Sequence, residues 1–548
     1  MKNSKIVSLS FLALSAFLLP GCKSGSNEAA VRAAWQTGDV ATASLKLQES
    51  AAPEKLENAD DPVLRILDAG LVAGLNGEYE LSDRFFADAD ALLKDSYQQG
   101  EEKSLAGAVA SVFSSEYELS AQETIMVPVL QTYALLGGSD KGAASSAAQA
   151  IDNATRAVRE AQAVRMLARR EESKKSFDFS FPGSDGQPIE GSACSFSPAA
   201  EAETAVDWAE IYGGDDAAPD FDRGEAEALF VNPFAYWLSG AVLLHRAADI
   251  NAVNDAAALF REAVIVTGEQ SPFLVSELNY AHELGKAESI TTALNSDLFK
   301  EWENSTYVIY EGGTAPAIGG KAVEVKVPKP LVAVAATLVA GIGQLGGTGL
   351  VVPTSGTAYL PAVASCGSVP EISVNGAPLE VIVDYDAVLD ETLRMDAKSA
   401  VSSAVLGVSF EYVKRAGALI GAGLVMQAAA ENGDKFAMMG AEAALTAAVA
   451  YASSPIELSR PDSRRWALLP RTLEVAKIKT PADGIIDISG EEVRVPAKGV
   501  NFVRVRKVDK YWPATVQVFP LDENAQDVVP VKRLSARPRP VSTKPAAE

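Results

Sequence analysis

The chain has 548 residues, and its 72 acidic residues outnumber 48 Lys and Arg, which gives a formal net charge of −24. Nucleic-acid binding needs a clustered basic surface that displaces counterions from phosphates, so this balance excludes nucleic acid as a partner. Hydrophobic residues make up 48% of the chain. That content is ample for real cores, and the length predicts about two to four domains.

The chain begins like a secretory signal peptide. A basic start precedes the uncharged stretch Ile6–Leu19, which is shorter than the roughly 20 residues of a membrane-spanning helix. The stretch ends Leu19-Pro20-Gly21-Cys22, which resembles a bacterial lipobox, although Pro20 departs from the usual small residue. The resemblance implies cleavage before Cys22 and acylation of its thiol with chains such as palmitate. The alternative is a plain signal peptide with an incidental cysteine.

Several acyl chains hold a protein at a membrane far more firmly than one chain does. Lipoproteins of Gram-negative bacteria with a residue other than Asp after the acylated cysteine are generally sorted to the outer membrane, and Lys23 stands at that position. We therefore expect a lipid-anchored protein on the periplasmic face of the outer membrane. In that oxidising compartment, Cys194 and Cys366 either form a disulfide or remain two free thiols.

Two helical hairpins are predicted in the first part of the mature chain. Apolar and small residues recur every three or four positions in 67–75 and 81–90, on either side of Gly77, as two antiparallel close-packed helices require. The same spacing appears in 235–244 and 255–263. Both hairpins resemble tetratricopeptide (TPR) repeats, but their irregular placement favours a solenoid-like packing over a strict array.

From about residue 306 the period changes from helical to alternating. Alternation bounded by Gly and Pro predicts strands, and an Asn375-Gly376 turn joins two of them. The segment 389–452 returns to helix between the strands. The predicted strands cover 307–310, 323–327, 371–374, 379–383, 493–495, 502–508 and 514–519.

Together these patterns predict an α+β fold, with a TPR-like α-helical repeat region followed by a smaller mixed α/β domain. The predicted parts in chain order are a signal peptide (1–21), a TPR-like helical region (22–175), a flexible insertion (176–213), a second TPR-like helical region (214–304), a mixed α/β domain (305–520) and a disordered Pro/Arg-rich tail (521–548).

Side chains for catalysis or metal binding are scarce. His245 and His282 are the two histidines of the chain, and neither has a Cys or His partner at ligand spacing. Asp384 and Asp386 follow an apolar strand and are either a carboxylate pair for a cation or a solvated strand end. Gly341-x-Gly343-x-x-Gly346 matches a nucleotide-binding pattern in letters only, since glycines replace the expected helix start. We expect no cofactor, no metal and no enzymatic activity.

Two apolar segments raise the question of a membrane span. Leu331–Val352 is uncharged and long enough to cross a bilayer, but its glycines favour a buried strand or loop. Gly417 and Gly421 have the spacing with which helices pack closely in lipid, although Lys414 and Arg415 interrupt the apolar run. Close packing of helices in a soluble core is the interpretation we favour.

Four segments resemble a family of uncharacterised bacterial lipoproteins that combine a tetratricopeptide-like helical half with a small β-containing C-terminal half. The resemblance covers most of the chain in outline. Asp462 and Arg464 are expected to pair or to cap a helix, and Trp466 and Leu469 to bury at a domain seam before Pro470 stops that helix. The segments are Asn232-Pro233-Phe234, Glu311-x-Gly313-x-x-Pro316, Asp462-x-Arg464-x-Trp466-x-x-Leu469-Pro470 and the hairpin near Gly77.

The family has no assigned activity that the resemblance could imply for this chain. The anchor, the helical hairpins and the scarcity of catalytic side chains predict a non-catalytic binding or scaffold module for envelope proteins or peptidoglycan. One alternative is an enzyme that acts on envelope glycan through two buried carboxylates, which need no histidine. Another is a structural subunit of an assembly or export machine that docks through the Pro/Arg-rich tail.

Overall fold

The fold was derived from a computed structural model. It describes residues 26–56, 61–99, 120–138, 143–157, 177–179, 194–196, 232–267, 270–327, 332, 352–364, 369–395, 397–432, 435–458, 466, 468–521 and 530–534. The described residues do not include Cys22, Leu331, Cys366, Asp462 or Arg464. Of Cys194 only the backbone is described.

Helices come first in the described chain, and both predicted hairpins are confirmed. In the first hairpin, Gly77 lies at the turn between the two helices. Its φ is +85°, a conformation that is unfavourable for residues with a Cβ. The helices are α2 (Ser26–Thr37), α3 (Val40–Ser50), α4 (Pro53–Leu56), α5 (Pro62–Leu75), α6 (Tyr79–Gln99), α8 (Ala121–Gly137), a segment over 144–157, α13 (Pro233–His245), α14 (Ile250–Val266), α15 (Pro272–Gly285), α16 (Ile290–Leu294) and α17 (Asp297–Trp302).

A six-stranded sheet follows, in the order β15-β14-β13-β3-β10-β8. β13 and β3 are parallel neighbours, and the other neighbouring strands are antiparallel. Its strands are β3 (Ser305–Gly312), β8 (Glu380–Asp384), β10 (Thr472–Lys479), β13 (Asn501–Lys507), β14 (Thr515–Pro520) and β15 (Lys532–Arg533).

The two faces of this sheet are covered differently. Tyr307, Leu473 and Phe502 belong to a core shared with the helices, whereas Val308 and Val503 pack against a smaller sheet. The described core therefore has three layers: helices, the large sheet and the small sheet. The small sheet has the order β12-β11-β6-β7 and consists of β6 (Ser373–Val374), β7 (Ala377–Pro378), β11 (Ile485–Ile488) and β12 (Glu491–Arg494).

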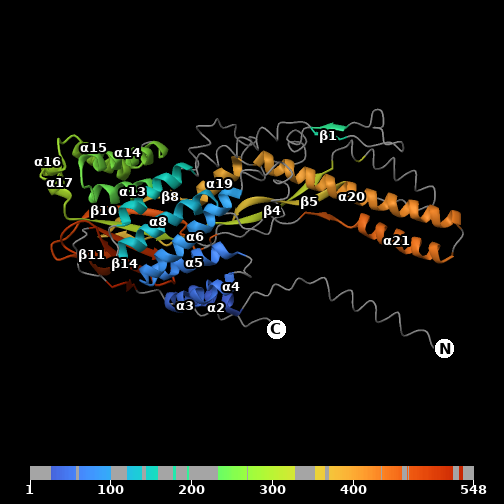
Figure 1. The fold of residues 1–548 in the computed structure, drawn as a ribbon, viewed down its shortest axis with the longest axis horizontal. Coiled ribbons are helices and arrows are strands. Elements are labelled where there is room, and N and C mark those ends of the chain that lie inside the picture. The colour runs from blue at the N-terminus through green and yellow to red at the C-terminus, as the bar shows by residue number, and fades with distance from the viewer. Residues whose placement is uncertain are drawn as a thin grey trace.

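Between β3 and β10 the chain makes a third sheet and a long helical hairpin. β4 (Ala317–Lys326) pairs with β5 (Ser355–Ala364), which pairs with β9 (Ile456–Glu457). After α19 (Tyr385–Met395), α20 (Ala397–Asn432) and α21 (Lys435–Ser453) form the hairpin, which we call the arm. Figure 1 shows the arm extending away from the N-terminal helices and the large sheet. At the usual rise per residue, α20 is about 54 Å long.

The α20 helix rests on the third sheet along part of its length. Val408, Tyr412 and Leu419 are buried with Val325 and Leu360 of that sheet. Beyond Leu419, no residue of α20 belongs to this described cluster, and α20 and α21 contact each other.

The mixed fold, with helices first and sheets later, is confirmed, as are the Asn375-Gly376 turn and the helical segment between the strands. Residues 177–179 and 194–196 of the predicted insertion pair as two short strands, β1 (Phe177–Phe179) and β2 (Cys194–Phe196). None of the helices in the described part of the chain is both long and apolar enough to cross a bilayer.

Candidate functional site

Asn232 organises the first of the family-like segments. Its Oδ1 accepts a hydrogen bond from the Ala235 amide at 3.1 Å and so caps α13, whose first turn contains Pro233. Its Nδ2 donates to the hydroxyl of Tyr385 at 3.1 Å. Phe234 is buried, with its ring centroid 5.5 Å from that of Trp237. This segment therefore fixes where α13 begins and ties it to α19.

Glu311, in the second segment, is fully buried at the end of β3. Arg504 of β13 donates to both carboxylate oxygens, from Nε at 2.7 Å and from Nη2 at 2.8 Å. Gly313 follows with a φ of +68°, a left-handed conformation that favours glycine, and Pro316 is buried. The pair is a bidentate salt bridge inside the core.

The second and third segments meet at Arg506. Its guanidinium donates to the backbone oxygens of Glu311 at 2.9 Å, Gly313 at 2.5 Å and Leu468 at 3.0 Å. Burial lowers the pKa of Arg506 to about 10, and Glu311 opposes that shift. Arg506 therefore holds the turn after β3 against the turn before β10.

The expectation that Pro470 stops a helix is wrong. Residues 468–470 form a turn that leads into β10, because the Ala315 amide donates to Leu469 O and the Arg471 amide to Gly312 O, both at 2.8 Å. Trp466 and Leu469 are buried as predicted, and the Trp466 amide donates to Glu123 Oε1 at 2.6 Å.

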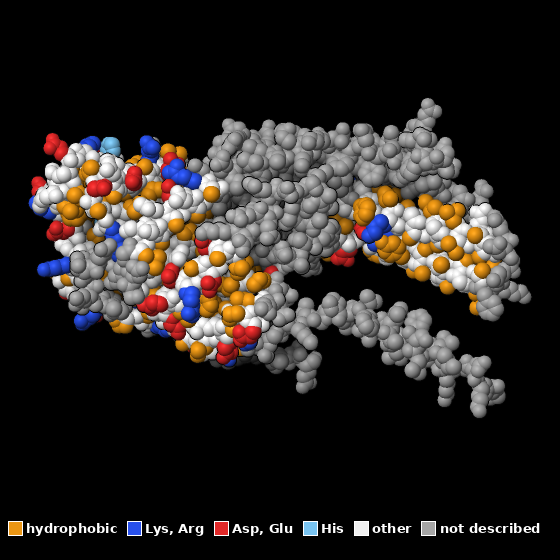
Figure 2. All heavy atoms as spheres, viewed as in Figure 1, with side chains coloured by type: hydrophobic (Ala, Val, Ile, Leu, Met, Phe, Trp, Pro, Cys, Tyr) orange, Lys and Arg blue, Asp and Glu red, His pale blue; other side chains and the backbone are white. Residues whose placement is uncertain are grey.

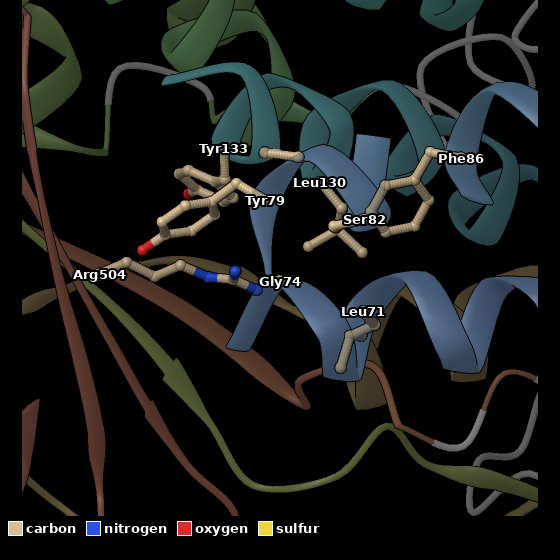
Figure 3. A pocket seen from close by; sticks show the side chains of 9 residues that line it. Leu71, Gly74, Tyr79, Ser82, Phe86, Leu130, Tyr133 and Arg504 are labelled. Atoms are coloured by element: carbon tan, nitrogen blue, oxygen red, sulfur yellow. The ribbon is translucent and has the colours of Figure 1, made fainter. Parts of the chain in front are cut away.

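A small cavity lies beside the Arg504 side chain. The guanidinium carbon is 4.6 Å from the centre of the Tyr133 ring, and Tyr79, Ser82 and Phe86 line the same space (Figure 3). The cavity has room for about one water molecule. Pockets for small ligands are typically several hundred Å³, so this space fits no substrate.

A second buried network joins α13 and α15 to the sheet. Lys477 of β10 lies 2.8 Å from Glu277 Oε1, and the Tyr307 hydroxyl donates to Glu277 Oε2 at 2.7 Å. The Lys477 ammonium is 4.4 Å from the ring centre of Tyr280 and 5.0 Å from that of Tyr307. These cation–π contacts and the ion pair satisfy the lysine inside the protein.

His245 closes this network. Its Nε2 lies 3.1 Å from the Tyr307 hydroxyl. Because that hydroxyl gives its proton to Glu277, the histidine Nε2 must carry a proton and donate. Burial, aided by Lys477, lowers the pKa of His245 to about 3. The ring is therefore neutral near pH 7 and is held as a hydrogen-bond donor. His282 lies on the exposed side of α15.

The acidic pair at the end of β8 has local structural roles. Asp384 Oδ1 accepts from the Asp386 amide at 3.0 Å, and Asp386 forms an ion pair with Arg471. Among the described residues, no three His, Cys, Asp or Glu side chains gather as metal ligands.

Arg504 and Arg506 were missed in the sequence, although a signal for them exists. They alternate with Val503 and Val505 in β13, whose apolar face packs against the small sheet. Two arginines that alternate with apolar residues in a strand need buried partners, and the acidic residue of a neighbouring strand supplies one.

The arm carries several large apolar side chains that are exposed. Phe410 and Met439 are 62% and 67% exposed, and Leu424, Val425 and Tyr451 are also exposed. Figure 2 shows hydrophobic side chains along the arm and few charged ones. Contiguous exposed apolar surface in proteins marks interaction sites. No protein-family model, curated protein or solved structure matches the chain.

Proposed function

We propose that this chain is a lipid-anchored cell-envelope protein that acts as a non-catalytic scaffold and uses the arm to bind other envelope proteins. The observation that carries the proposal is the exposed apolar surface of the arm, formed by large side chains such as Phe410 and Met439. An apolar surface suits a protein partner better than a polar cell-wall glycan.

The location follows from the lipobox-like end of the leader. Acylation of Cys22 would hold the protein at the periplasmic face of the outer membrane, and the family resemblance and a TPR-like packing of the helices belong to the same proposal. Metabolic labelling with palmitate should label the wild type and leave Cys22→Ala unlabelled and released from membranes. Label on Cys22→Ala, or none on the wild type, would refute the anchor.

Binding through the arm is tested by photo-crosslinking in intact cells. A photoreactive residue at Met439 on α21 should yield adducts with one or a few other envelope proteins. The same residue at Ile265 on α14, which is 63% exposed, is the matched control on the helical body and should yield none of these adducts. Identical adducts at both positions, no adduct at Met439, or adducts with cell-wall material alone would contradict the proposal.

A further inference from the structure

The lipid anchor proposed at Cys22 is separated from α2 by only three residues. An extended chain spans at most about 3.6 Å per residue, so Ser26 lies within about 14 Å of the acylated cysteine. The 12 residues of α2 are about 18 Å long at the usual helical rise. The hairpin of α2 and α3 therefore begins close to the membrane surface that holds the acyl chains.

This hairpin packs on the body with one side and exposes the other. Ala43 and Leu47 of α3 are buried in the core shared with the large sheet. Figure 1 shows α2 and α3 at the edge of the helical body. The exposed residues are short side chains and one large apolar residue, which we call the outer face: Ala33, Thr37, Ala41, Thr42 and Leu45.

The C-terminal strand β15 places two basic residues at the turn of the same hairpin. β15 pairs with β14, and Arg533 donates to Gly38 O at 2.9 Å. Lys532 and Arg533 are both exposed. They begin the segment 531–547, which contains five basic residues and no acidic one. In a chain of net charge −24, a basic segment thus starts beside the hairpin that follows the anchor.

We propose that the outer face and β15 together lie on a bilayer with anionic headgroups, as a second membrane contact beside the acyl chains. The proposal rests on the lipid anchor proposed above, which brings the hairpin to the membrane. Acyl chains and a basic patch together attach a protein to a membrane more firmly than one signal alone. Each basic residue near an anionic surface strengthens binding by about fivefold.

Asp39 and Glu49, the acids of the hairpin whose side chains are described, each have a basic neighbour. Glu49 lies 2.9 Å from Lys46 in an ion pair. Asp39 caps α3 and lies close enough to Arg533 for their charges to interact. Anionic headgroups can therefore approach this side of the protein without meeting an isolated carboxylate.

A bilayer suits the outer face better than a protein partner does. Leu45 is its one large apolar residue, whereas stable protein interfaces bury about 800 Å² per partner around an apolar core. A membrane needs no such core, because the anchor already holds the hairpin beside it. Residues 23–50 contain three basic and three acidic residues, whereas 51–99 contain 4 and 11. The hairpin is therefore repelled less by anionic lipid than the helices that follow it.

Cosedimentation of the full mature chain, produced without acyl chains, with vesicles at low salt tests the surface apart from the anchor. We expect binding to vesicles of equal parts phosphatidylglycerol and phosphatidylcholine, and none to phosphatidylcholine alone. Lys532→Glu should raise the lipid concentration for half-binding about tenfold or more, since it replaces an attracted charge with a repelled one. Lys326→Glu, exposed on β4, is the matched control and should change it less than about twofold. No binding, equal binding to both kinds of vesicle, or equal effects of the two variants would overturn the proposal.

The orientation is read in the acylated protein bound to vesicles. A fluorescent amino acid at Leu45, which is 59% exposed, should be quenched by lipids with spin-labelled headgroups. The same amino acid at Ile265, 63% exposed on α14 at the opposite edge of the body, should not be quenched (Figure 1). Equal quenching at both positions would refute the orientation. Palmitate labelling reports on the anchor separately: an unlabelled Cys22 refutes the anchor, while the vesicle test without acyl chains still decides the surface.

Discussion

At the scale of single residues, Glu311 and Arg504 form an ion pair in the interior. Both side chains are withdrawn from water, and the bidentate geometry satisfies the two carboxylate oxygens. A buried pair of this kind adds little net stability over apolar residues, but removing one partner leaves an uncompensated charge in the core. Its effect on stability therefore depends on whether one or both partners are replaced.

Replacing Glu311 by Leu should lower the free energy of unfolding by about 3 to 5 kcal/mol, measured by urea denaturation. The double variant with Arg504→Met should lose much less than the two single variants together. The exposed pair Lys479 and Glu301, 3.2 Å apart, is the control. Glu301→Leu should cost less than about 1 kcal/mol. A loss at Glu311 no larger than at Glu301 would show that the buried charge is not the cause.

Asp68 supplies a pH-dependent prediction. Burial raises the pKa of Asp68 to about 7, and the negative charge of Glu123 acts in the same direction. A carboxyl with a raised pKa favours its neutral form in the folded state, so its ionisation destabilises the fold as pH rises from about 4 to 7. The melting temperature of Asp68→Asn minus that of the wild type should therefore increase from pH 5 to pH 8. A difference that stays constant or falls with pH would contradict this assignment.

At the scale of elements, the α5–α6 turn depends on Gly77. Its φ is +85°, and a Cβ there would lie 3.0 Å from Val531 Cγ2. Gly77→Ala should lower the free energy of unfolding by about 1 to 2 kcal/mol, the usual cost of left-handed backbone with a Cβ. Gly77→Asn should cost less, because Asn tolerates this conformation. Equal losses in the two variants would point to the Val531 contact in place of backbone strain.

The whole molecule is held by contacts between its first and last described elements. The Trp512 indole donates to Trp35 O at 2.7 Å, and Arg533 donates to Gly38 O at 2.9 Å. One hydrophobic core runs from Ala34 to Leu521 and includes both the helices and one face of the large sheet. The helices and this sheet therefore bury their apolar side chains against each other.

A shared core predicts joint unfolding. Amide protons of α13 and of β13 should lose their protection from hydrogen exchange at the same urea concentration, because neither element buries its apolar face without the other. Measuring exchange by mass spectrometry across a urea series checks this. Loss of protection in α13 at a clearly lower concentration than in β13 would show that the helices unfold as a separate unit.

Several elements were predictable because their cause is local. Gly77 and the Asn375-Gly376 turn mark positive φ values, and the alternation of 323–327 marks the strand β4. The partners of Arg506 were not predictable, because the four backbone carbonyls that it binds come from segments far apart in the sequence. Asp384 and Asp386 were left open, and only the Arg471 ion pair and the local cap explain them.

The sequence by itself determined that helices come first, that strands follow and that a helical segment separates strands, since periodicity and turn residues act over a few neighbouring positions. Its leader also supports the expectation of a lipid anchor at Cys22. Only the tertiary structure decided which side chains face one another. It placed Glu311 and Glu277 in buried networks, and it left Phe410 and Leu424 of α20 exposed. Burial and pairing depend on contacts between distant segments, which the local pattern does not specify.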